Sequence, residues 1–248
     1  MSLHLGTSGW SYDHWEGVLY PPGLPVGRRR EVYTETFTTV ELNASFYRWP
    51  GERPFHRWGQ SLPDDFRMSV KASRWLTHGH RLRDPDGAWA RRLGAAMEAL
   101  GKHAGVVLLQ LADDFERDDE RLSTFLGSLP TSLRVAVELR HPSWDDDGVY
   151  QLLEHHRAAY VVTSGARLRC VLRATAPFVY VRWHGPSEHH LYAGSYSADD
   201  LRWWADRIRE WQAQGRDVWG YFNNDGAGNA VRNCRDLIGL LDGPQIGV

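Results

Sequence analysis

An α/β fold built on one closed parallel barrel is predicted by three features of this 248-residue sequence. Eight short apolar runs, rich in Val, Leu, Phe and Tyr and bounded by Gly, Pro or Asp, have the composition of strands. Helical patterns lie between most of these runs, and strands that alternate with helices pair in parallel through right-handed crossovers. The length also matches one (βα)8 barrel. We therefore expect residues 1–248 to form a single TIM-type barrel domain, with an open doubly wound sheet as the competing arrangement.

The expected strands and helices alternate along the whole chain. The strands are Leu3–Gly9, Thr39–Phe46, Phe66–Ser73, Gly105–Ala112, Arg134–His141, Ala158–Gly165, Phe178–Gly185 and Asp217–Asn224. The helices are Arg29–Phe37, Trp89–His103, Glu120–Leu129, Val149–His156, Asp200–Gln214 and Gly228–Leu241. Pro54–Leu62 allows only a short helix, and Ala166–Ala176 has no helical period. The sixth crossover of the barrel is therefore expected to be irregular.

The overall composition narrows the range of partners. A net charge of −2 and a pI near 6.6 provide no general field that would attract nucleic acid or an anionic membrane. No apolar run approaches the roughly 18 residues of a membrane span, and the first residues lack the pattern of a signal peptide. Cys170 and Cys234 form neither a metal-binding spacing nor a disulfide framework. These features predict a cytoplasmic protein with no membrane partner, and they leave its oligomeric state undefined.

Six of the expected strands become polar at their C-terminal ends. The segments are Val40–Asn43, Ser69–Lys71, Leu108–Gln110, Val137–His141, Tyr180–Gly185 and Tyr221–Asp225. An unpaired charge inside a sheet would cost several kcal/mol, so these ends should meet where charges can be satisfied. In a barrel that place is the C-terminal mouth, which carries the active site in enzymes of this fold. We therefore expect one polar pocket at the strand ends.

Alternation along each strand predicts which side chains point into the barrel. Glu41 shares a face with Asn43, Glu138 shares a face with Arg140, and Arg182 shares a face with His184. The candidate substrate-binding residues are Arg140, Arg182, Lys71, Asn43, Gln110, Asn223, Asn224, Asp225 and Trp144. The candidate catalytic residues are Glu138, Glu41 and His184.

Seven segments of the chain, in order, resemble motifs of the YecE-like family, a numbered family of proteins of unknown function (number seventy-two). They are GTSGWSYDHWEGVLYP, VELNASFYR, FRMSVKASRWLTH, LLQL, VELRHPSW, VYVRWHG and YFNNDGAGNAVRN. The resemblance covers nearly the whole chain and implies a TIM-type barrel with a polar pocket at the strand ends. It implies no reaction. The chain departs from the family pattern at Ala112-Asp113, where a proline pair is usual, and at Cys234, where alanine is usual.

The predicted pocket is richer in cations than in carboxylates. Lys71, Arg140 and Arg182 face Glu41 and Glu138, with Asp225 as a third carboxylate if it points inward. Arginine suits bidentate binding of phosphate or carboxylate, and glycines after the last strand open a helix whose N–H groups could bind an anion. The leading hypothesis is an enzyme that acts on a phosphorylated or nucleotide-like anionic substrate. The alternatives are structural Glu–Arg pairs, or a protein that binds an anion or a nucleic-acid end without turnover.

Several kinds of chemistry fit these residue types. Glu138, Glu41 and His184, or His78, could act as general acid and base of a hydrolase or lyase. Lys71 could form a Schiff base if its pKa were depressed. A glycoside hydrolase with two carboxylates is disfavoured by the excess of cations.

No cofactor is predicted. A divalent metal is an alternative, opposed by the three cations; its ligands would come from Glu41, Glu138, His78, His141, His184 and Asp225. Tryptophans near the strand ends could instead stack a base or a sugar. They are Trp10, Trp49, Trp75, Trp144 and Trp183.

Overall fold

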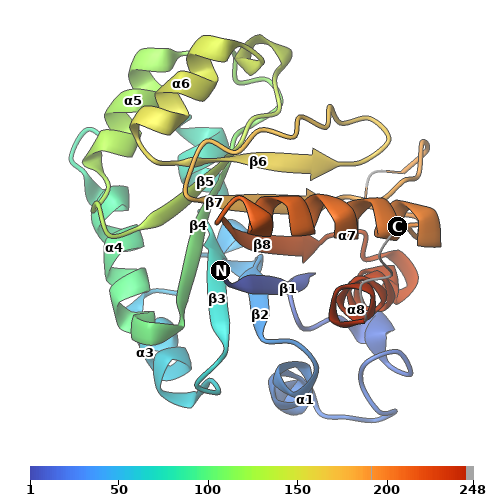
Figure 1. The fold of residues 1–248 in the computed structure, drawn as a ribbon. Coiled ribbons are helices and arrows are strands. Elements are labelled where there is room, and N and C mark those ends of the chain that lie inside the picture. The colour runs from blue at the N-terminus through green and yellow to red at the C-terminus, as the bar shows by residue number, and fades with distance from the viewer. Residues whose placement is uncertain (191, 244–248) are drawn as a thin grey trace.

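The computed structural model describes residues 1–190 and 192–243, and it contains a closed barrel of eight parallel strands (Figure 1). Each strand pairs with the next along the chain, and β8 pairs with β1 to close the ring. The strands are β1 (Leu3–Ser8), β2 (Thr39–Leu42), β3 (Arg67–Lys71), β4 (Ala104–Gln110), β5 (Arg134–Glu138), β6 (Ala159–Ser164), β7 (Phe178–Trp183) and β8 (Asp217–Phe222). The predicted (βα)8 barrel is confirmed.

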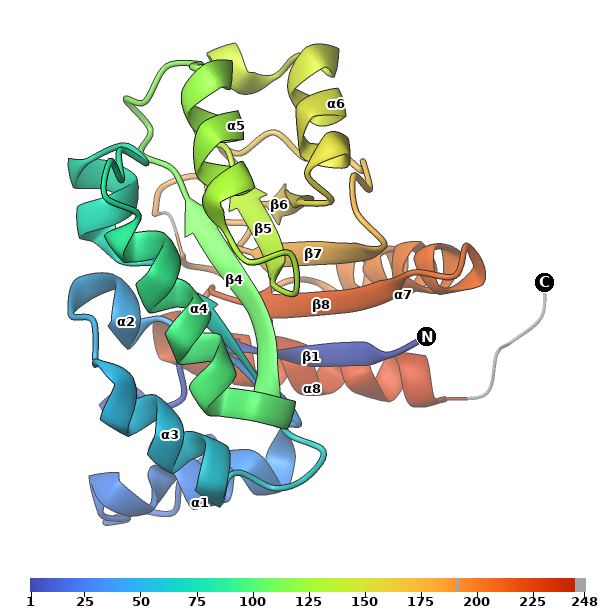
Figure 2. The ribbon, with the colours of Figure 1, turned by 90° about the vertical axis from the view of Figure 1, so that its left-hand side faces the viewer.

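Helices cover the outside of the barrel, as the two perpendicular views in Figures 1 and 2 show. They are α1 (Arg29–Thr36), α2 (Ala44–Tyr47), α3 (Glu52–Ser61), α4 (Ala88–Leu100), α5 (Asp119–Ser128), α6 (Asp147–His155), α7 (Ala198–Ala213) and α8 (Asn229–Asp242). Residues 165–177, which connect β6 to β7, are all described and contain no helix. The irregular sixth crossover is thus confirmed. The α3 helix runs for ten residues, longer than expected, because Pro54 lies in its first turn, where the missing N–H costs nothing.

The second strand ends four residues earlier than the sequence suggested. The α2 helix starts at Ala44, and the Ser45 hydroxyl lies 2.8 Å from the carbonyl oxygen of Leu42 and 2.7 Å from that of Lys71. The single O–H of this hydroxyl can donate to either carbonyl at the ends of the two neighbouring strands, so the chain can turn into a helix there. The turn places Phe46 beside the end of β3, where it contacts Lys71.

The interior of the barrel is apolar in its lower layers and polar at the C-terminal end. Its buried inner cluster is Val106, Leu108, Ala136, Ala159, Val161, Ala176, Phe178, Tyr180, Trp219 and Tyr221. The hydroxyl of Tyr221 lies 2.8 Å from the hydroxyls of both Thr39 and Ser69, so it links three strands across the interior. The next inward residues of β2 and β3 are Glu41 and Lys71, which begin the polar layer.

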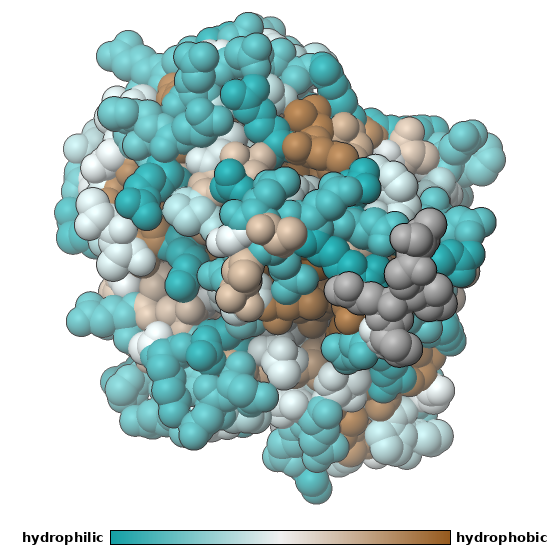
Figure 3. Space-filling view, in the orientation of Figure 1, coloured by the Kyte–Doolittle hydropathy of each residue, from teal (hydrophilic) through white to brown (hydrophobic). Residues whose placement is uncertain are grey.

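A second, larger apolar core fills the space between the strands and the helices. Trp183 belongs to it: its ring stacks on Phe222, with centroids 4.4 Å apart, and meets Trp204 of α7 edge-on. The face of the molecule in Figure 3 is largely hydrophilic, with small separate apolar patches. Within the described residues, no helix combines the length and apolarity needed to cross a membrane.

Candidate functional site

A buried arginine joins two glutamates at the C-terminal end of the barrel. Arg182, the last inward residue of β7, donates from Nε and Nη2 to Glu41 of β2 at 2.9 and 2.7 Å. Its Nη1 donates to Oε2 of Glu138 on β5 at 2.5 Å. All three side chains are 0% exposed. Arg182 therefore forms the floor of the mouth and ties three strands together.

Glu41 has its hydrogen-bonding capacity filled. Besides two bonds from Arg182, it accepts from Ser8 Oγ at 2.6 Å and from the Tyr180 hydroxyl at 2.8 Å. A carboxylate offers about four acceptor positions, and all four are used here. Burial alone would raise the pKa of Glu41, but the charge and hydrogen bonds of Arg182 outweigh it, and the net pKa is lowered. Glu41 is therefore held as an anion.

Glu138 is also ionised, and it has the most varied set of partners. Its Oε1 accepts from Gln110 Nε2 at 2.9 Å and from the Arg140 guanidinium, and its Oε2 accepts from Arg182. Burial acts to raise the pKa of Glu138, but Arg140 and then Arg182 lower it well below its ordinary range. Glu138 and Glu41 together thus carry the two negative charges that balance the two arginines.

His184 is a buried neutral imidazole next to Glu138. Its Nε2 lies 3.5 Å from Glu138 Oε1, and its Nδ1 lies 3.2 Å from the side-chain amide of Asn223. Burial is the main cause that lowers the pKa of His184 to about 4. If the Asn223 amide donates to Nδ1, the imidazole proton is on Nε2 and points toward the carboxylate.

Lys71, the last residue of β3, is not paired with a carboxylate, unlike the two arginines. It is only 6% exposed, yet its ammonium makes no hydrogen bond or ion pair to any of the described residues; its close contact is the Phe46 ring, 4.0 Å away. Burial first, and then the charge of Arg182, lower the pKa of Lys71 to about 7. The ring favours the charged form by only about 0.5–2 kcal/mol, too little to restore an ordinary lysine pKa.

Arg140 lies at the outer edge of the same network. Its side chain is 12% exposed, and it pairs with Glu138. It also lines a cavity of about 280 Å³ that extends away from the mouth between the ends of β5 and β6. Trp144, Tyr150, Tyr160 and Thr163 are among the other walls of this cavity. Arg167 also lines it, and Arg169 there is paired with Asp145. Arg140 therefore contacts both the buried network of Arg182 and its glutamates and the partly aromatic cavity.

The structure gathers most of the predicted site residues at the mouth and directs two of them elsewhere. Asn224 is fully buried and donates to the Gly194 carbonyl and the Asn233 side chain, both at 2.9 Å. Asp225 accepts from the Trp15 indole at 2.5 Å and pairs with His14 at 2.9 Å. Both residues therefore hold the loops around the mouth, and Asp225 does not balance the inner cations as the sequence suggested. These bonds could not be predicted because the partners come from three other parts of the chain: the turn at His14 and Trp15, the segment around Gly194, and Asn233 of α8.

The tryptophans near the strand ends serve mainly as packing. Trp144 is 1% exposed and donates its indole N–H to the Phe115 carbonyl at 2.7 Å, although it lines the 280 Å³ cavity. Trp183 points outward into the larger core, because it is one residue out of phase with Arg182. Trp75 alone is half exposed, and it stacks on His80. A continuous aromatic wall around the mouth is therefore not formed by these residues.

Two members of the network are absent from the candidates that the sequence suggested. Ser8 and Tyr180 both bond to Glu41, and each lies on the inward face of its strand. The same alternation that pairs Arg182 with His184 also places Tyr180 on that face, so the sequence does contain a signal for it. His78, suggested as a proton carrier or a metal ligand, lies on the π-helical turn Trp75–Gly79 and packs edge-on against Phe46, 5.1 Å between ring centroids.

Metal-binding side chains do not cluster in the parts of the chain that the structure describes. No group of three or more His, Cys, Asp or Glu residues there has the geometry to hold an ion. Glu41 and Glu138 face Arg182, while Asp225 faces His14.

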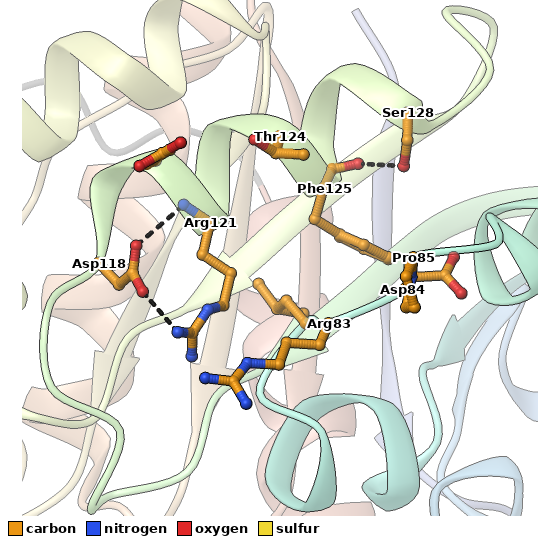
Figure 4. A pocket seen from close by; sticks show the side chains of 10 residues that line it. Arg83, Asp84, Pro85, Asp118, Arg121, Thr124, Phe125 and Ser128 are labelled. Carbon is orange, nitrogen blue, oxygen red and sulfur yellow. Dashed lines mark hydrogen bonds and ion pairs between the residues drawn. The ribbon is translucent and has the colours of Figure 1, made fainter.

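A separate cavity of about 450 Å³ lies away from the mouth (Figure 4). It is lined by residues of the segment before α4, including Arg83 and Pro85, and by residues along α5, including Phe125. An ion pair between Arg121 and Asp118, at 2.8 Å, stands at its edge. None of the residues of the barrel network lines it.

Comparisons with known proteins agree with this architecture. Residues 4–246 match the family described as "Protein of unknown function DUF72". The chain is 27% identical to UPF0759 protein YunF of Bacillus subtilis (strain 168), over 97% of this chain and 95% of YunF. A crystal structure of a DUF72 family protein from Thermotoga maritima MSB8 covers 98% of this chain and 100% of its own, with a TM-score of 0.88 and 27% identity. D-psicose 3-epimerase, at 11% identity and a TM-score of 0.59 over 98% of this chain and 100% of its own, shares the fold alone. The chain therefore belongs to the DUF72 family, the YecE-like family that its motifs resemble.

Proposed function

We propose that the barrel mouth is an active site for a small anionic substrate, phosphorylated or nucleotide-like. The observation that carries this proposal is Lys71: a buried amine with three potential donors and no acceptor among the described residues. A phosphate or carboxylate oxygen beside Lys71 would supply both the missing acceptors and the missing negative charge.

The charges of the network support an anion rather than a cation as ligand. Arg182 is neutralised by two carboxylates, and Glu138 is shared with Arg140. His184 is neutral, so the two glutamates, the two arginines and a protonated Lys71 together carry one positive charge. That surplus is located at Lys71, which makes no ion pair with the described residues, and at Arg140, whose side chain is 12% exposed.

The remaining groups have natural roles around such a ligand. Gln110, Asn43 and Asn223 would add polar contacts, and the side-chain oxygen of Asn43 is buried without a partner in the described structure. Glu138 and His184 would handle protons, while Glu41 would hold Arg182 in place, because its acceptor positions are filled. The cavity beside Arg140, with Tyr150 and Tyr160, has space for the larger part of a nucleotide-like molecule.

Sulfate and inorganic phosphate are expected to stabilise the protein. At tenfold excess over its dissociation constant, an anion should add about 1.4 kcal/mol to the free energy of unfolding, which corresponds to about 3–5 °C in melting temperature. Affinity for sulfate, measured by calorimetry, should fall as the pH rises through 7, because Lys71 loses its proton there. Lys71→Met should abolish this binding, and Lys102→Met, at a position 59% exposed, should retain it. Anions that leave the melting temperature of the unaltered protein unchanged would contradict the proposal.

Binding without turnover is the second candidate function. The observation that favours it is the complete hydrogen bonding of Glu41 and the strong pairing of Glu138, which make both carboxylates weak bases. Glu138→Gln separates the two candidates once a substrate is known. Loss of turnover with retained affinity supports an enzyme with Glu138 in a catalytic role, whereas loss of both or of neither does not support that role.

A further inference from the structure

Lysine is scarce in this chain, and one of its lysines is buried in the barrel. The sequence has 27 arginines and two lysines. Lys102 is exposed and pairs with Asp64 at 2.6 Å, whereas Lys71 ends β3 inside the mouth. An arginine would supply positive charge at this position as well, and arginine fills every other cationic position of the network. Lysine differs from arginine in one property that matters here: its amine can lose a proton and act as a nucleophile.

The surroundings of Lys71 favour that use. No hydrogen bond or ion pair with the described residues occupies its amine, so its lone pair is free once the proton leaves. Burial removes most of the water that would stabilise an ammonium, Arg182 and, less strongly, Arg140 oppose protonation, and Glu41 and Glu138 favour it. A desolvated amine near other cations is an arrangement that activates lysine as a nucleophile.

We propose that Lys71 is a catalytic nucleophile that forms an imine with a small carbonyl compound bearing a negative charge. This inference rests on the anion-binding function proposed above and specifies its substrate class. The negative group would lie against the exposed edge of Arg140, and the carbonyl carbon would lie against Lys71 Nζ.

The step balances without an oxidant, a reductant or a further reactant. The Lys71 lone pair attacks the carbonyl carbon, a C–N bond forms, and the carbonyl electrons move to oxygen. The nitrogen gives up two protons as the oxygen gains two, the C–O bond breaks, and water leaves as the C=N bond forms. Addition of one proton from solvent to the imine nitrogen gives an iminium, which withdraws electrons from the adjacent carbon and weakens the bond next to the former carbonyl. Bond cleavage of that kind belongs to the lyase class.

Reductive trapping tests the proposal on the unaltered protein. We expect glyoxylate with cyanoborohydride at pH 7 to convert Lys71 to its carboxymethyl derivative at least about tenfold faster than Lys102, because an ordinary lysine amine with a pKa near 10.4 is almost entirely protonated there. Peptide mass mapping distinguishes the two lysines and the N-terminal amine.

Glycolaldehyde, which is uncharged, should label Lys71 more slowly than glyoxylate does, and sulfate should protect Lys71 from glyoxylate. Lys71→Arg should remove this label alone, and Lys102→Arg should leave it unchanged.

The possible results separate the two proposals. Labelling of Lys71 no faster than of Lys102 would overturn the imine proposal, and if sulfate still raises the melting temperature, the anion site stands without it. Equal labelling by glyoxylate and glycolaldehyde, with no protection by sulfate, would overturn the anionic substrate class and with it the proposed function. Circular dichroism of both arginine variants shows whether a lost label reflects chemistry or unfolding; if Lys71→Arg does not fold, the comparison of Lys71 with Lys102 in the unaltered chain decides the question.

Discussion

Replacing Arg182 with methionine is expected to lower the free energy of unfolding by about 3–5 kcal/mol, because two carboxylates would lose their buried counter-charge. Glu41 and Glu138 are fully buried and receive three hydrogen bonds from this one guanidinium. Both pKa values are lowered in the folded protein, so both glutamates are ionised at neutral pH. Denaturant unfolding at pH 7 measures the loss directly.

Two comparison variants show whether the loss arises from the buried network. Arg202→Met removes an exposed pair with Asp199 on α7 and should change stability by less than about 1 kcal/mol. Adding Glu41→Gln to Arg182→Met should restore part of the loss, because it removes one unpaired buried charge. A loss below about 1 kcal/mol for Arg182→Met would contradict this account. It would show that water or rearranged side chains stabilise the two glutamate charges without Arg182.

Replacing Lys71 with methionine is expected to stabilise the protein below pH 7. The pKa of Lys71 is about 7 in the folded chain against 10.5 in its ordinary state. Below pH 7 both folded and unfolded chains carry the proton, and the folded chain bears the full cost of the buried charge. A shift from 10.5 to about 7, at about 1.4 kcal/mol per pKa unit, sets this cost at up to about 5 kcal/mol. Methionine matches the length of the lysine stem without the charge.

The sign of the pH dependence distinguishes this effect from simple repacking. Between pH 7 and 10.5 the unfolded chain binds a proton that the folded chain has released, so the unaltered protein gains stability as the pH rises. The advantage of Lys71→Met should therefore shrink by about 1.4 kcal/mol per pH unit in this range. Lys102→Met should be within about 0.5 kcal/mol of the unaltered protein throughout. An advantage for Lys71→Met that does not vary with pH, or a loss of stability at pH 6, would mean that Lys71 is charged and satisfied in the fold.

The barrel and the inward side chains could be predicted from the sequence because both depend on local regularity. Alternation along a strand fixes which residues share a face, so the order of residues alone puts Arg182 and His184 together. The polar ends of the strands then indicate a shared mouth. Tyr180 follows from the same rule, but a tyrosine in an apolar run does not stand out as a polar residue.

The pairing of the charges could not be predicted in the same way. The sequence contains three cations and two carboxylates at these strand ends, but which cation is left without a partner depends on distances across the barrel. Arg182 is long enough to reach Glu41 and Glu138 together, and this leaves Lys71 unpaired. Asn224 and Asp225 lie beyond the end of β8, where alternation no longer applies. Their direction is set by partners outside the strands, such as Trp15 and Asn233 of α8.

The pKa of Lys71 should change when an anion binds beside its amine. Because the chain has two lysines, selective 13C labelling of lysine should give one side-chain signal for each, and substitution of Lys102 assigns them. We expect the Lys71 signal to titrate with a pKa near 7 in the absence of anions, and saturating sulfate to raise this pKa by about one unit or more. A Lys71 signal that titrates near 10.4, with or without sulfate, would contradict both the unpaired amine and the anion site built on it.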